Sequence, residues 1–489
     1  MQFNSLAYLL FLPVVAFLYF VLPARLKNPL LLGASYFFYM NWNAVYALLM
    51  LASTAMTYAC GLLIGKADSQ RVKRWAVGVC FALNLGILFF FKYFHFTSDT
   101  IRELARVLFE IDLRRPTLEV LLPVGISFYT FQALGYTVDV YRGKLPPVRN
   151  FLQYALFVSF FPQLVAGPIE RSTHLLDQFS RTYRFDYERM RSGVLLIGWG
   201  LFKKMVVADR LAIVTNQVYG EIRAYSGVSL LVATLCFAFQ IYCDFSAYSD
   251  IARGSARILG ISLMKNFRTP YLSRSIREFW QRWHISLSSW FRDYLYIPLG
   301  GSRHGAARKY VNLMIVFLVS GLWHGAAMTF VLWGLLNGLY QVAGALSQPM
   351  RTRLRAGLGI AEHSVSHRVT QVVITFALTL TAWVFFRADS IGDALYGVTH
   401  LWIPTLWQLT DGSLLTLGLG LPDLLVGVLS VCLVMGVEWL AQRKDLAGIL
   451  FRQPLIYRWA LYLCLVFGIL VFGSYGTGYA DQSFLYFQF

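Results

Sequence analysis

Charged residues are scarce in this sequence. Asp, Glu, Lys and Arg make up only 14% of its 489 residues, whereas a soluble globular chain carries about a quarter. Hydrophobic residues make up 57%. This balance excludes a soluble enzyme and a disordered chain, and it is typical of a protein that crosses a membrane several times.

Motifs of several enzyme and scaffold classes are missing as well. There is no HExxH zinc motif, no phosphate-binding or dinucleotide-binding glycine motif, no GxSxG nucleophile motif and no Cys-x-x-Cys pair. The cysteines fall in or beside apolar stretches, which favours a packing role over disulfides; they are Cys60, Cys80, Cys236, Cys243, Cys432 and Cys464. We therefore expect no metal site and no tightly bound cofactor.

Acidic residues are outnumbered by basic ones. The chain has 43 Lys and Arg against 25 Asp and Glu, a net charge of +18. In a soluble protein this excess would suggest a nucleic-acid partner. In a membrane protein it follows from the enrichment of Lys and Arg in cytoplasmic loops, so we expect no nucleic-acid partner.

Long apolar windows recur along the chain and predict membrane helices. They lie at 5–23, 28–40, 43–65, 76–94, 118–141, 150–168, 192–212, 228–246, 311–331, 332–348, 370–386, 421–441 and 457–474. The first window follows no basic region and precedes no cleavage site, so we expect a helix there rather than a signal peptide. The sequence predicts an all-α polytopic bundle of about 12 spanning helices with re-entrant or amphipathic cytoplasmic segments, in a single domain over 1–489.

The basic loops orient these helices. Three loops rich in Lys and Arg are expected in the cytoplasm: 66–74, 349–368 and 442–458. Loop 387–420 and the tail 473–489 have few or no basic residues and are expected outside. Loop 95–116 does not fit this pattern, because it falls outside yet carries four arginines: Arg102, Arg106, Arg114 and Arg115.

One apolar window is predicted not to span. Segment 150–168 lies between two basic loops, 142–149 and 169–191, and a single crossing would put one of them outside. Pro162, Gly167 and Pro168 also interrupt a helix there. We expect the segment to dip in and return, or to be buried without spanning. A kinked spanning helix is the alternative.

Segment 253–309 is the least membrane-like part of the chain, and we expect it in the cytoplasm as an amphipathic or re-entrant catalytic segment. Apolar and aromatic residues between Ile276 and Tyr294 recur every three or four positions, which predicts an amphipathic helix. Its polar face is Arg277, Gln281, His284 and Ser288. A helix that only lies on the membrane surface is the alternative. A histidine among arginines, followed by a Pro-Leu-Gly-Gly break, favours chemistry.

His324 is the second chemical candidate. It lies in the apolar stretch from Ser320 to Tyr340, flanked by Gly321 and Gly325, and we expect it well inside a helix. An ionisable side chain at membrane depth is by default a functional-site hypothesis, and burial keeps the ring neutral and able to accept a proton. The alternative is a histidine that only hydrogen-bonds another helix.

Five stretches together carry a resemblance to a known family. They are LLPVGISFYTFQALGYTVDVYRG (121–143), FFPQLVAGPIER (160–171), IYCDFSAYSDIARG (241–254), the run 266–301 with RWHISLSSWFRDYLYIPLGG, and SGLWHGAAMTF (320–330). The chain resembles the membrane-bound O-acyltransferase family, in the bacterial branch that acetylates alginate, over essentially its whole length.

The resemblance implies an enzyme that moves an acyl group from a thioester to a hydroxyl. His324 matches the family's intramembrane histidine and His284 its second polar residue. The resemblance implies acetyl-CoA as the donor, an exopolysaccharide such as alginate or cellulose as the final acceptor, periplasmic acetyltransferase partner proteins and the bacterial inner membrane as the location.

A thioester made in the cytoplasm and an acceptor outside require a through-membrane catalytic tunnel. We expect His324 to act as general base and His284 to orient the thioester or stabilise the oxyanion. We expect the donor to contact Arg274, Arg277, Arg282, Trp283 and Ser288, although such arginines are often only solvated or paired with carboxylates. Asp244, Asp250 and Trp323 are candidates for the tunnel wall, with helix capping or pairing with Arg253 as the alternative for the two acids.

The tail 473–489 ends in FLYFQF (484–489). It resembles the C-terminal aromatic motif of the small partner peptide in teichoic acid D-alanylation, which makes Tyr486 the candidate acyl carrier. An aromatic interface anchor is the alternative. Two other functions remain open: an O-acyltransferase that acts on a lipid or a protein, and a transporter without chemistry, although no internal repeat is evident.

Overall fold

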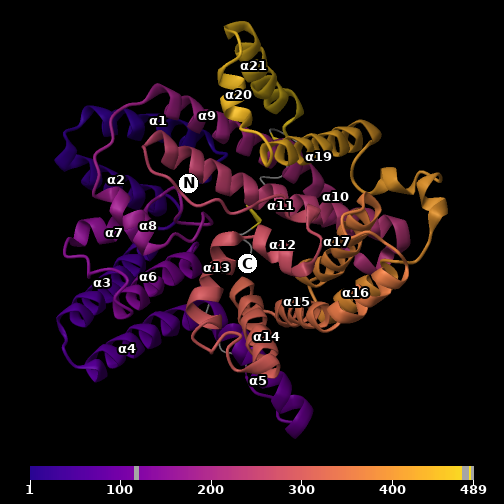
Figure 1. Cartoon of the computed structure of the whole chain (residues 1–489), viewed down its shortest axis with the longest axis horizontal. Coiled ribbons are helices and arrows are strands. Elements are labelled where there is room, and N and C mark those ends of the chain that lie inside the picture. Colours follow the sequence, from indigo (N-terminus) through magenta and orange to yellow (C-terminus); the bar gives the residue numbers. More distant parts are fainter. Residues whose placement is uncertain (115–120, 476–483, 486–489) are drawn as a thin grey trace. The chain divides into compact units, whose positions relative to one another are not determined.

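The computed structural model describes residues 1–114, 121–475 and 484–485. Within these ranges the regular structure is entirely helical (Figure 1). The described part of the chain holds eight helices that are long and apolar enough to cross a membrane. The prediction of an all-α, multi-pass membrane bundle is confirmed.

The chain divides into two compact units. Unit 1 consists of Met1–Val194 and Ala252–Met264, and unit 2 of Leu195–Ile251 and Lys265–Phe489. Each unit is described by itself below. The predicted single domain over 1–489, with its segment 253–309 and its outer tail 473–489, stays a prediction.

Unit 1 is a set of helices around a core rich in tyrosine. Tyr154 is fully buried and donates a hydrogen bond to Thr57 Oγ1 at 2.7 Å. Its helices are α1 (Leu6–Val21), α2 (Ala24–Met40), α3 (Ala44–Lys66), α4 (Gln70–Leu88), the π-helical η1 (Phe89–Tyr93), α5 (Phe94–Phe109), α6 (Ile126–Tyr141), α7 (Phe151–Ser159), α8 (Ser172–Phe179) and the first part of α9 (Tyr187–Phe202).

Unit 2 contains both candidate histidines. Its α-helices, besides parts of α9 and α11 (Gly227–Ile258), are α10 (Asp209–Gly220), α12 (Ile276–Arg282), α13 (Ile285–Phe291), α14 (Gly305–His324), α15 (Met328–Leu346), α16 (Gln348–Gly357), α17 (Val365–Arg387), α18 (Ile391–His400), α19 (Leu421–Ala441), α20 (Leu446–Phe451) and α21 (Leu455–Phe472). Two π-helical segments, η2 (Lys203–Ala208) and η5 (Arg292–Tyr296), and four short 3-10 turns complete it: η3 (Ile222–Ala224), η4 (Pro270–Leu272), η6 (Leu406–Leu409) and η7 (Ser413–Thr416).

The count of about 12 spanning helices is not confirmed. The eight candidate spans are Ala44–Lys66, Gln70–Phe109, Gly227–Ile258, Gly305–His324, Met328–Leu346, Val365–Arg387, Leu421–Ala441 and Leu455–Phe472. Helix α1 has 16 residues, about 24 Å, which is shorter than a hydrocarbon core of about 30 Å. Helix α21 has no buried residue, as expected of a helix whose sides face lipid.

Segment 150–168 does not form a spanning helix. Helix α7 ends at Ser159, and no helix resumes before Ser172. Nine residues extend only about 14 Å, too little to cross a bilayer. Phe160, Phe161 and Leu164 in the irregular stretch are buried, as backbone without helical hydrogen bonds requires at membrane depth. The alternative of a kinked spanning helix is wrong.

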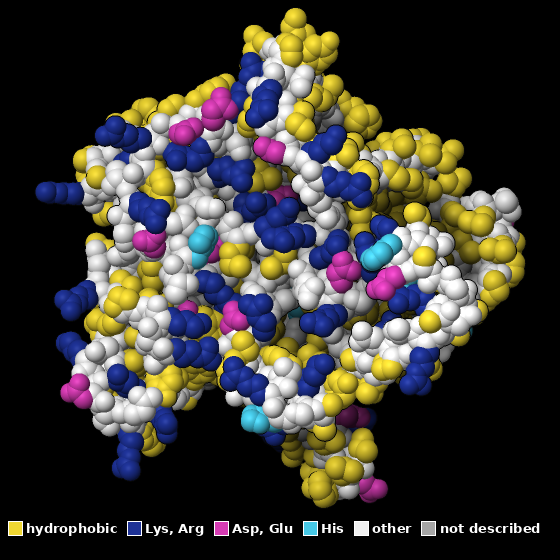
Figure 2. All heavy atoms as spheres, in the orientation of Figure 1, with side chains coloured by type: hydrophobic (Ala, Val, Ile, Leu, Met, Phe, Trp, Pro, Cys, Tyr) yellow, Lys and Arg dark blue, Asp and Glu magenta, His cyan; other side chains and the backbone are white. Residues whose placement is uncertain are grey.

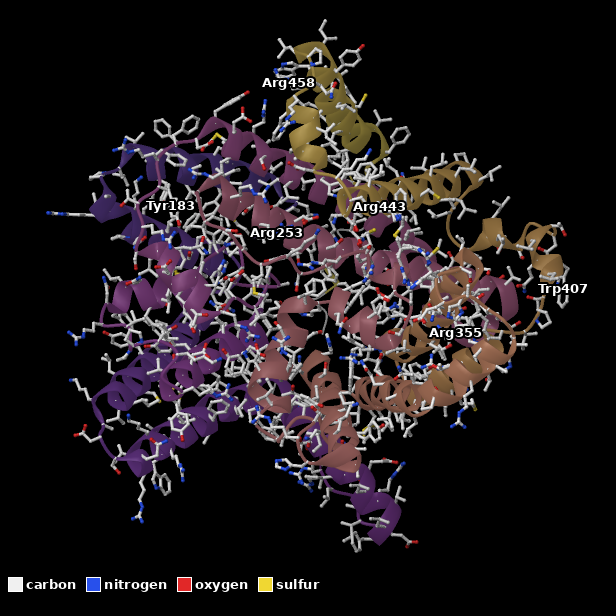
Figure 3. The ribbon with its side chains drawn as sticks, viewed as in Figure 1. Tyr183, Arg253, Arg355, Trp407, Arg443 and Arg458 are labelled. Atoms are coloured by element: carbon white, nitrogen blue, oxygen red, sulfur yellow. The ribbon has the colours of Figure 1, made fainter. Side chains whose placement is uncertain are left out.

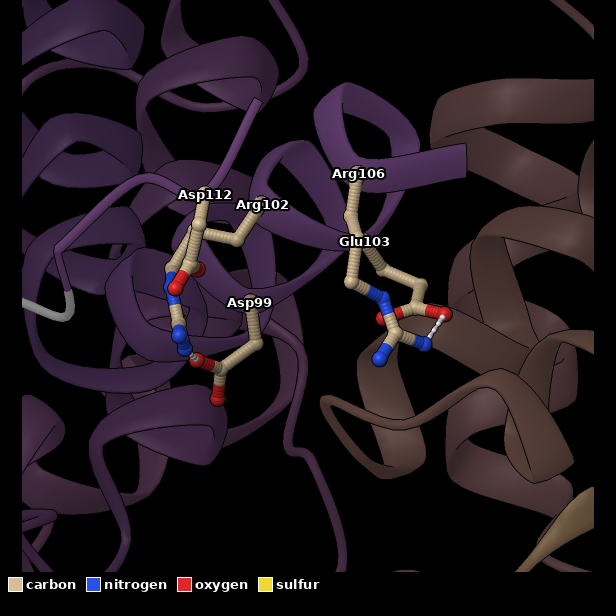
Figure 4. A pocket seen from close by; sticks show the side chains of 5 residues that line it. All are labelled: Asp99, Arg102, Glu103, Arg106 and Asp112. Atoms are coloured by element: carbon tan, nitrogen blue, oxygen red, sulfur yellow. Dashed lines mark hydrogen bonds and ion pairs between the residues drawn. The ribbon is translucent and has the colours of Figure 1, made fainter. Parts of the chain in front are cut away.

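The basic loop 95–116 has a local explanation. Arg102 pairs with Asp99 at 3.4 Å and Arg106 with Glu103 at 2.6 Å. These four residues and Asp112 line a surface pocket beside α5 (Figure 4). Because neighbouring acids offset these two arginines, the loop is much less cationic than its arginine count indicates. Arg115 lies outside the described residues.

Candidate active site

His324 lies at a helix end rather than inside a helix. Helix α14 ends at His324, Gly325 is extended, and α15 starts at Met328. The two helices pack closely: a Cβ at Gly321 would overlap with the carbonyl oxygen of Phe330. The expectation of a mid-helix histidine is therefore corrected. His324 is nevertheless only 5% exposed.

Aromatic rings surround the imidazole of His324. Its ring centroid lies 5.0 Å from that of Trp333 and 5.5 Å from that of Phe386, both nearly perpendicular to it. Trp383 stacks on Trp333, with 6.0 Å between the ring centroids. These rings keep bulk water away from the imidazole, which strengthens any electrostatic interaction made there.

His284 interrupts the predicted amphipathic helix. Helix α12 ends at Arg282 and α13 begins at Ile285, and His284 between them has φ 43° and ψ 55°. This left-handed conformation is unfavourable for a residue with a Cβ and persists where the surroundings enforce it, often at functional sites. One continuous helix over 276–294 is therefore a wrong prediction.

The same segment is buried rather than surface-lying. His284 is fully buried, not on a polar face, and Trp280 and Trp283 are less than 9% exposed. Trp280 packs on Trp333 and Trp283 on Trp383. The alternative of a helix that only lies on the membrane surface is wrong for these residues, because the aromatic side packs against protein.

Asn266 fixes the tautomer of His284. Its Oδ1 accepts hydrogen bonds from the backbone N–H of Ser286 at 3.2 Å and from Ser286 Oγ at 2.9 Å. A backbone N–H only donates, so this atom is the amide oxygen. It lies 3.2 Å from Nδ1 of His284, and Nδ1 therefore carries the proton. In the neutral ring Nε2 is then the acceptor nitrogen.

His284 is held in its neutral form. Burial lowers the pKa of His284 well below the ordinary value for histidine, and the neighbouring His324 lowers this pKa further. The ring is thus uncharged at neutral pH, with its proton on Nδ1.

The two predicted catalytic histidines meet in unit 2. They are 40 positions apart in the sequence, yet their ring centroids are 6.4 Å apart. Trp323 lies next to both rings, 5.9 Å from His284 and 5.0 Å from His324. Phe245 of α11 closes the other side of His284 at 4.6 Å. The arrangement is a buried, aromatic-walled site with two imidazoles, suited to proton transfer in a dry environment.

The predicted donor-binding residues are only partly brought together. Trp283 precedes His284 and belongs to the aromatic wall. Ser288 Oγ donates a hydrogen bond to Trp283 O at 3.3 Å and so closes the helix break. Arg282 pairs with Glu278. Arg274 and Arg277 are exposed.

Asp244 and Asp250 pair with two adjacent lysines of η2. Lys204 lies 2.7 Å from Asp244, and Lys203 lies 2.7 Å from Asp250. Both lysine side chains are at most 2% exposed. These ion pairs give each of the two acids a buried partner in unit 2.

Three polar residues near the site were missed by the sequence analysis. Asn266 carries no motif of its own, and only the fold brings it to His284. The signal for Lys203 and Lys204 was present, because two adjacent lysines interrupt the apolar window 192–212, and ionisable residues in such windows are functional hypotheses. Tyr486 lies outside the described residues.

Basic residues are abundant on the surface of each unit. In the space-filling view, Lys and Arg side chains outnumber acidic ones over either unit taken by itself (Figure 2). Arg355 and Arg443 of unit 2 are labelled in Figure 3; Arg355 pairs with Glu362, and Arg443 stacks over Trp439 at 4.0 Å. In the described part of the chain, no three His, Cys, Asp or Glu side chains gather as a metal site requires.

Comparisons with known proteins agree with the resemblance. The model of the MBOAT, membrane-bound O-acyltransferase family, matches residues 35–385, which include both histidines. The chain is 39% identical over 419 residues to the probable alginate O-acetylase AlgI of Pseudomonas syringae pv. tomato, covering 84% of this chain and 77% of that protein. It is 36% identical to the peptidoglycan O-acetyltransferase of Helicobacter pylori over 417 residues, 79% of this chain and 76% of the relative. It is 26% identical to the teichoic acid D-alanyltransferase of Bacillus subtilis over 234 residues, 44% of this chain and 57% of the relative.

Proposed function

The chain belongs to the membrane-bound O-acyltransferase family and is an O-acyltransferase, and from this premise we propose that it takes acetyl groups from cytoplasmic acetyl-CoA and delivers them to a hydroxyl for O-acetylation of an exopolysaccharide. The bacterial inner membrane is the proposed location. The relatives are named for alginate, peptidoglycan and teichoic acid, which supports a polymer as the final acceptor over a lipid or a protein.

One observation carries the proposal: His284 and His324 lie 6.4 Å apart between ring centroids, buried among aromatic rings. Acyl transfer from a thioester needs a base for the hydroxyl and a group that holds the donor, in a space that excludes water. Water at the site would hydrolyse the thioester instead.

The proposed step conserves protons. The acceptor hydroxyl oxygen attacks the thioester carbonyl carbon while His324 takes the hydroxyl proton. A tetrahedral intermediate forms and collapses, the carbon–sulfur bond breaks, and the thiolate leaves. His324 then returns the proton to the thiolate, which gives an acetyl ester and a free thiol.

His284 is proposed to orient the donor. Because its Nδ1–H is engaged by Asn266, a neutral His284 presents only an acceptor nitrogen. The pantetheine arm of acetyl-CoA has amide N–H groups that this nitrogen can hold. Of the two roles predicted for His284, donor orientation fits this tautomer, whereas donating a hydrogen bond to the oxyanion requires a protonated ring.

The route of the two substrates follows from topology. Acetyl-CoA is polyanionic, so its nucleotide stays on the cytoplasmic side while the pantetheine arm enters a tunnel toward His324. The exposed guanidinium groups of Arg274 and Arg277 are proposed to attract the phosphates. The hydroxyl enters from outside; it belongs to Tyr486 or to a periplasmic acetyltransferase partner, and the polymer receives the acetyl group afterwards.

The test uses purified protein and acetyl-CoA labelled in the acetyl group. Release of free thiol and label on the protein are measured for the wild type, His324→Ala and Tyr486→Phe. His304→Ala, an exposed histidine at the start of the same helix α14, is the matched control. We expect thiol release in the wild type and the control and its loss in His324→Ala.

If the acetyl label on the protein is lost in Tyr486→Phe, the result supports the tail as the acceptor. Label that persists there, with transfer to an added periplasmic partner, assigns the acceptor hydroxyl to that partner. Equal thiol release by wild type and His324→Ala contradicts the mechanism and favours a transporter.

A further inference from the structure

The described end of the C-terminal tail is buried in unit 2. Phe484 is 1% exposed and Leu485 is 6% exposed. A backbone N–H that is buried away from water needs a hydrogen-bond acceptor. The contacts of these two residues identify what holds the tail.

Contacts with Asp244, Lys204 and Tyr248 help to hold these two residues. The backbone N–H of Leu485 donates a hydrogen bond to Oδ2 of Asp244 at 2.8 Å. The ammonium group of Lys204 lies 4.5 Å from the ring centroid of Phe484, a cation–π contact. Tyr248, one turn along α11 from Asp244, meets the edge of the Phe484 ring at 5.1 Å.

Asp244 belongs to a buried cluster in which two carboxyl groups flank one lysine. Lys204 lies between two carboxylates, 2.7 Å from Asp244 and 2.8 Å from Asp209. Removing such charges from water is unfavourable unless further hydrogen bonds satisfy them. The Leu485 N–H supplies one, on the Asp244 oxygen that Lys204 does not take. The tail therefore contributes a hydrogen bond to the cluster.

The cluster lies next to the histidine site along the same helix. Phe245, the residue after Asp244, contacts the ring of His284 at 4.6 Å. The tail is thus held on the turn of α11 that also packs on His284. Lys204 comes from the π-helical segment η2, and such segments are frequent at functional sites.

We propose that Asp244, held in place by Lys204, is a positioning residue that docks the C-terminal segment of the same chain beside the two histidines. The proposal rests on the proposed function, in which that segment supplies the acyl-accepting hydroxyl. It adds a docking site for Phe484 and Leu485, defined by Asp244, Lys204, Asp209 and Tyr248.

An isosteric substitution separates docking from folding. In Asp244→Asn one of two acceptor oxygens becomes an NH2 group. If the remaining oxygen faces Lys204, the NH2 group faces the Leu485 N–H, and two donors meet. The tail contact is lost while the shape of the side chain is kept.

The neighbouring lysine offers a matched control. Lys203 also lies between two carboxylates, Asp250 at 2.7 Å and Glu438 at 3.2 Å. Glu438 contacts Lys203 and the hydroxyl of Tyr242, whose rotating O–H can accept as well as donate. The side chains of Asp250 and Glu438 are each 17% exposed, so Glu438→Gln removes one carboxylate from a similar but less deeply buried cluster, without a direct effect on the tail.

The experiment digests full-length purified protein with a carboxypeptidase and follows the C-terminus by mass spectrometry. In the wild type and in Glu438→Gln we expect digestion to stop before Leu485. In Asp244→Asn we expect digestion to continue past Phe484, at least about tenfold faster than any residual digestion there in the other two proteins, because a charge-assisted buried hydrogen bond is lost. The digestion is run well below the melting temperature of every variant, since Asp244→Asn also removes the charge that pairs with Lys204. The docking site is overturned if the tail of Asp244→Asn is digested at the wild-type rate. It is also overturned if Asp244→Asn and Glu438→Gln accelerate the digestion equally.

A second readout tests positioning. With labelled acetyl-CoA, Asp244→Asn should lower kcat for acetyl transfer by about tenfold or more while KM for acetyl-CoA stays constant. If the tail of Asp244→Asn is digested freely and this variant still transfers acetyl groups at the wild-type rate, the positioning role is overturned. If wild-type protein shows no turnover at all, the proposed function fails, but the digestion result still decides whether the tail docks.

Discussion

At the residue scale, Asn266 organises the histidine site. One amide oxygen accepts three hydrogen bonds, from Ser286 N, Ser286 Oγ and His284 Nδ1, and the amide nitrogen reaches Ser249 Oγ at 3.3 Å. The tautomer of His284 depends on this side chain, and the backbone carbonyl of Asn266 also accepts a hydrogen bond from the N–H of Ile285 at 2.9 Å, next to the left-handed residue.

Replacing Asn266 should lower both stability and activity, because its side chain holds several buried groups. Asn266→Ala leaves three buried donors without their acceptor, at a destabilisation of about 1–3 kcal/mol. A misplaced His284 should lower kcat/KM by about a hundredfold. The control is Ser249→Ala, which removes only the longest contact of Asn266. Melting temperature and acetyl transfer measure the two effects, and equal behaviour of both variants would contradict the role of Asn266.

The acid limb of the pH–rate profile should not come from His284. Burial and the nearby His324 lower the pKa of His284, so the ring stays neutral as pH falls through the ordinary range of histidine, about 6.5. His284→Gln should therefore reduce kcat/KM without moving its acid limb. A limb that shifts or disappears in this variant would show that His284 itself titrates there.

The sequence identifies some of these residues and not others. His324 and His284 are predicted because an imidazole is unusual among apolar and aromatic neighbours. Asn266 is not predicted, because a polar residue in a loop carries no signal until the fold shows what it contacts. Lys203 and Lys204 stand out in an apolar window, but only the three-dimensional structure shows that they pair with Asp250 and Asp244 of α11.

At the scale of elements, the α14–α15 pair places His324. Glycines let the two helices approach closely: a Cβ at Gly334 would overlap with the carbonyl oxygen of Phe317, and one at Gly321 with that of Phe330. Because backbone atoms cannot rotate away as side chains do, the spacing between the helices is fixed at these positions.

A methyl group at Gly334 should therefore separate the helices. Gly334→Ala is expected to lower the melting temperature in detergent and to reduce acetyl transfer, because Trp333 beside it contacts His324. Gly344→Ala on the same helix meets nothing within 4 Å and should be neutral or stabilising by up to about 1 kcal/mol. Similar effects of the two substitutions would show that close helix approach is not required.

Periodicity alone could not locate the break at His284. Apolar residues recur at helical intervals on both sides of it, so the pattern predicts one helix. The break is instead stabilised by Asn266, which precedes the segment in the chain and binds both His284 and Ser286. In segment 150–168, by contrast, the end of the helix could be predicted from Pro162 and Gly167, because proline removes a backbone donor and interrupts a helix.

At the scale of the whole molecule, charge should govern donor capture. The net charge is +18, which attracts a polyanionic donor. Added salt screens this attraction and reduces its range. KM for acetyl-CoA should rise about three- to tenfold between roughly 0.05 and 0.5 M NaCl, with kcat unchanged.

An acetyl thioester of pantetheine without the nucleotide phosphates is the control for this prediction. Its KM should not depend on salt. Equal salt dependence for both donors would mean that phosphate attraction is not part of donor binding.

The membrane character of the chain follows from composition, whereas the number of spans does not. Window hydropathy proposes a helix wherever an apolar run occurs. Hydropathy cannot distinguish a helix that crosses the membrane from a helix that is too short to cross, such as α1. Nor can it recognise a helix that is interrupted by buried ion pairs, such as the stretch around η2.

The most direct test of the central claim is a double-mutant cycle on the two histidines. Thiol release from acetyl-CoA is measured for the wild type, His284→Gln, His324→Gln and the double variant, each with a matched melting temperature. If the pair forms one catalytic centre, His324→Gln loses about a hundredfold to ten-thousandfold, and the double variant is no slower than the slower single one. Losses that multiply, or wild-type rates in His324→Gln, would contradict the account.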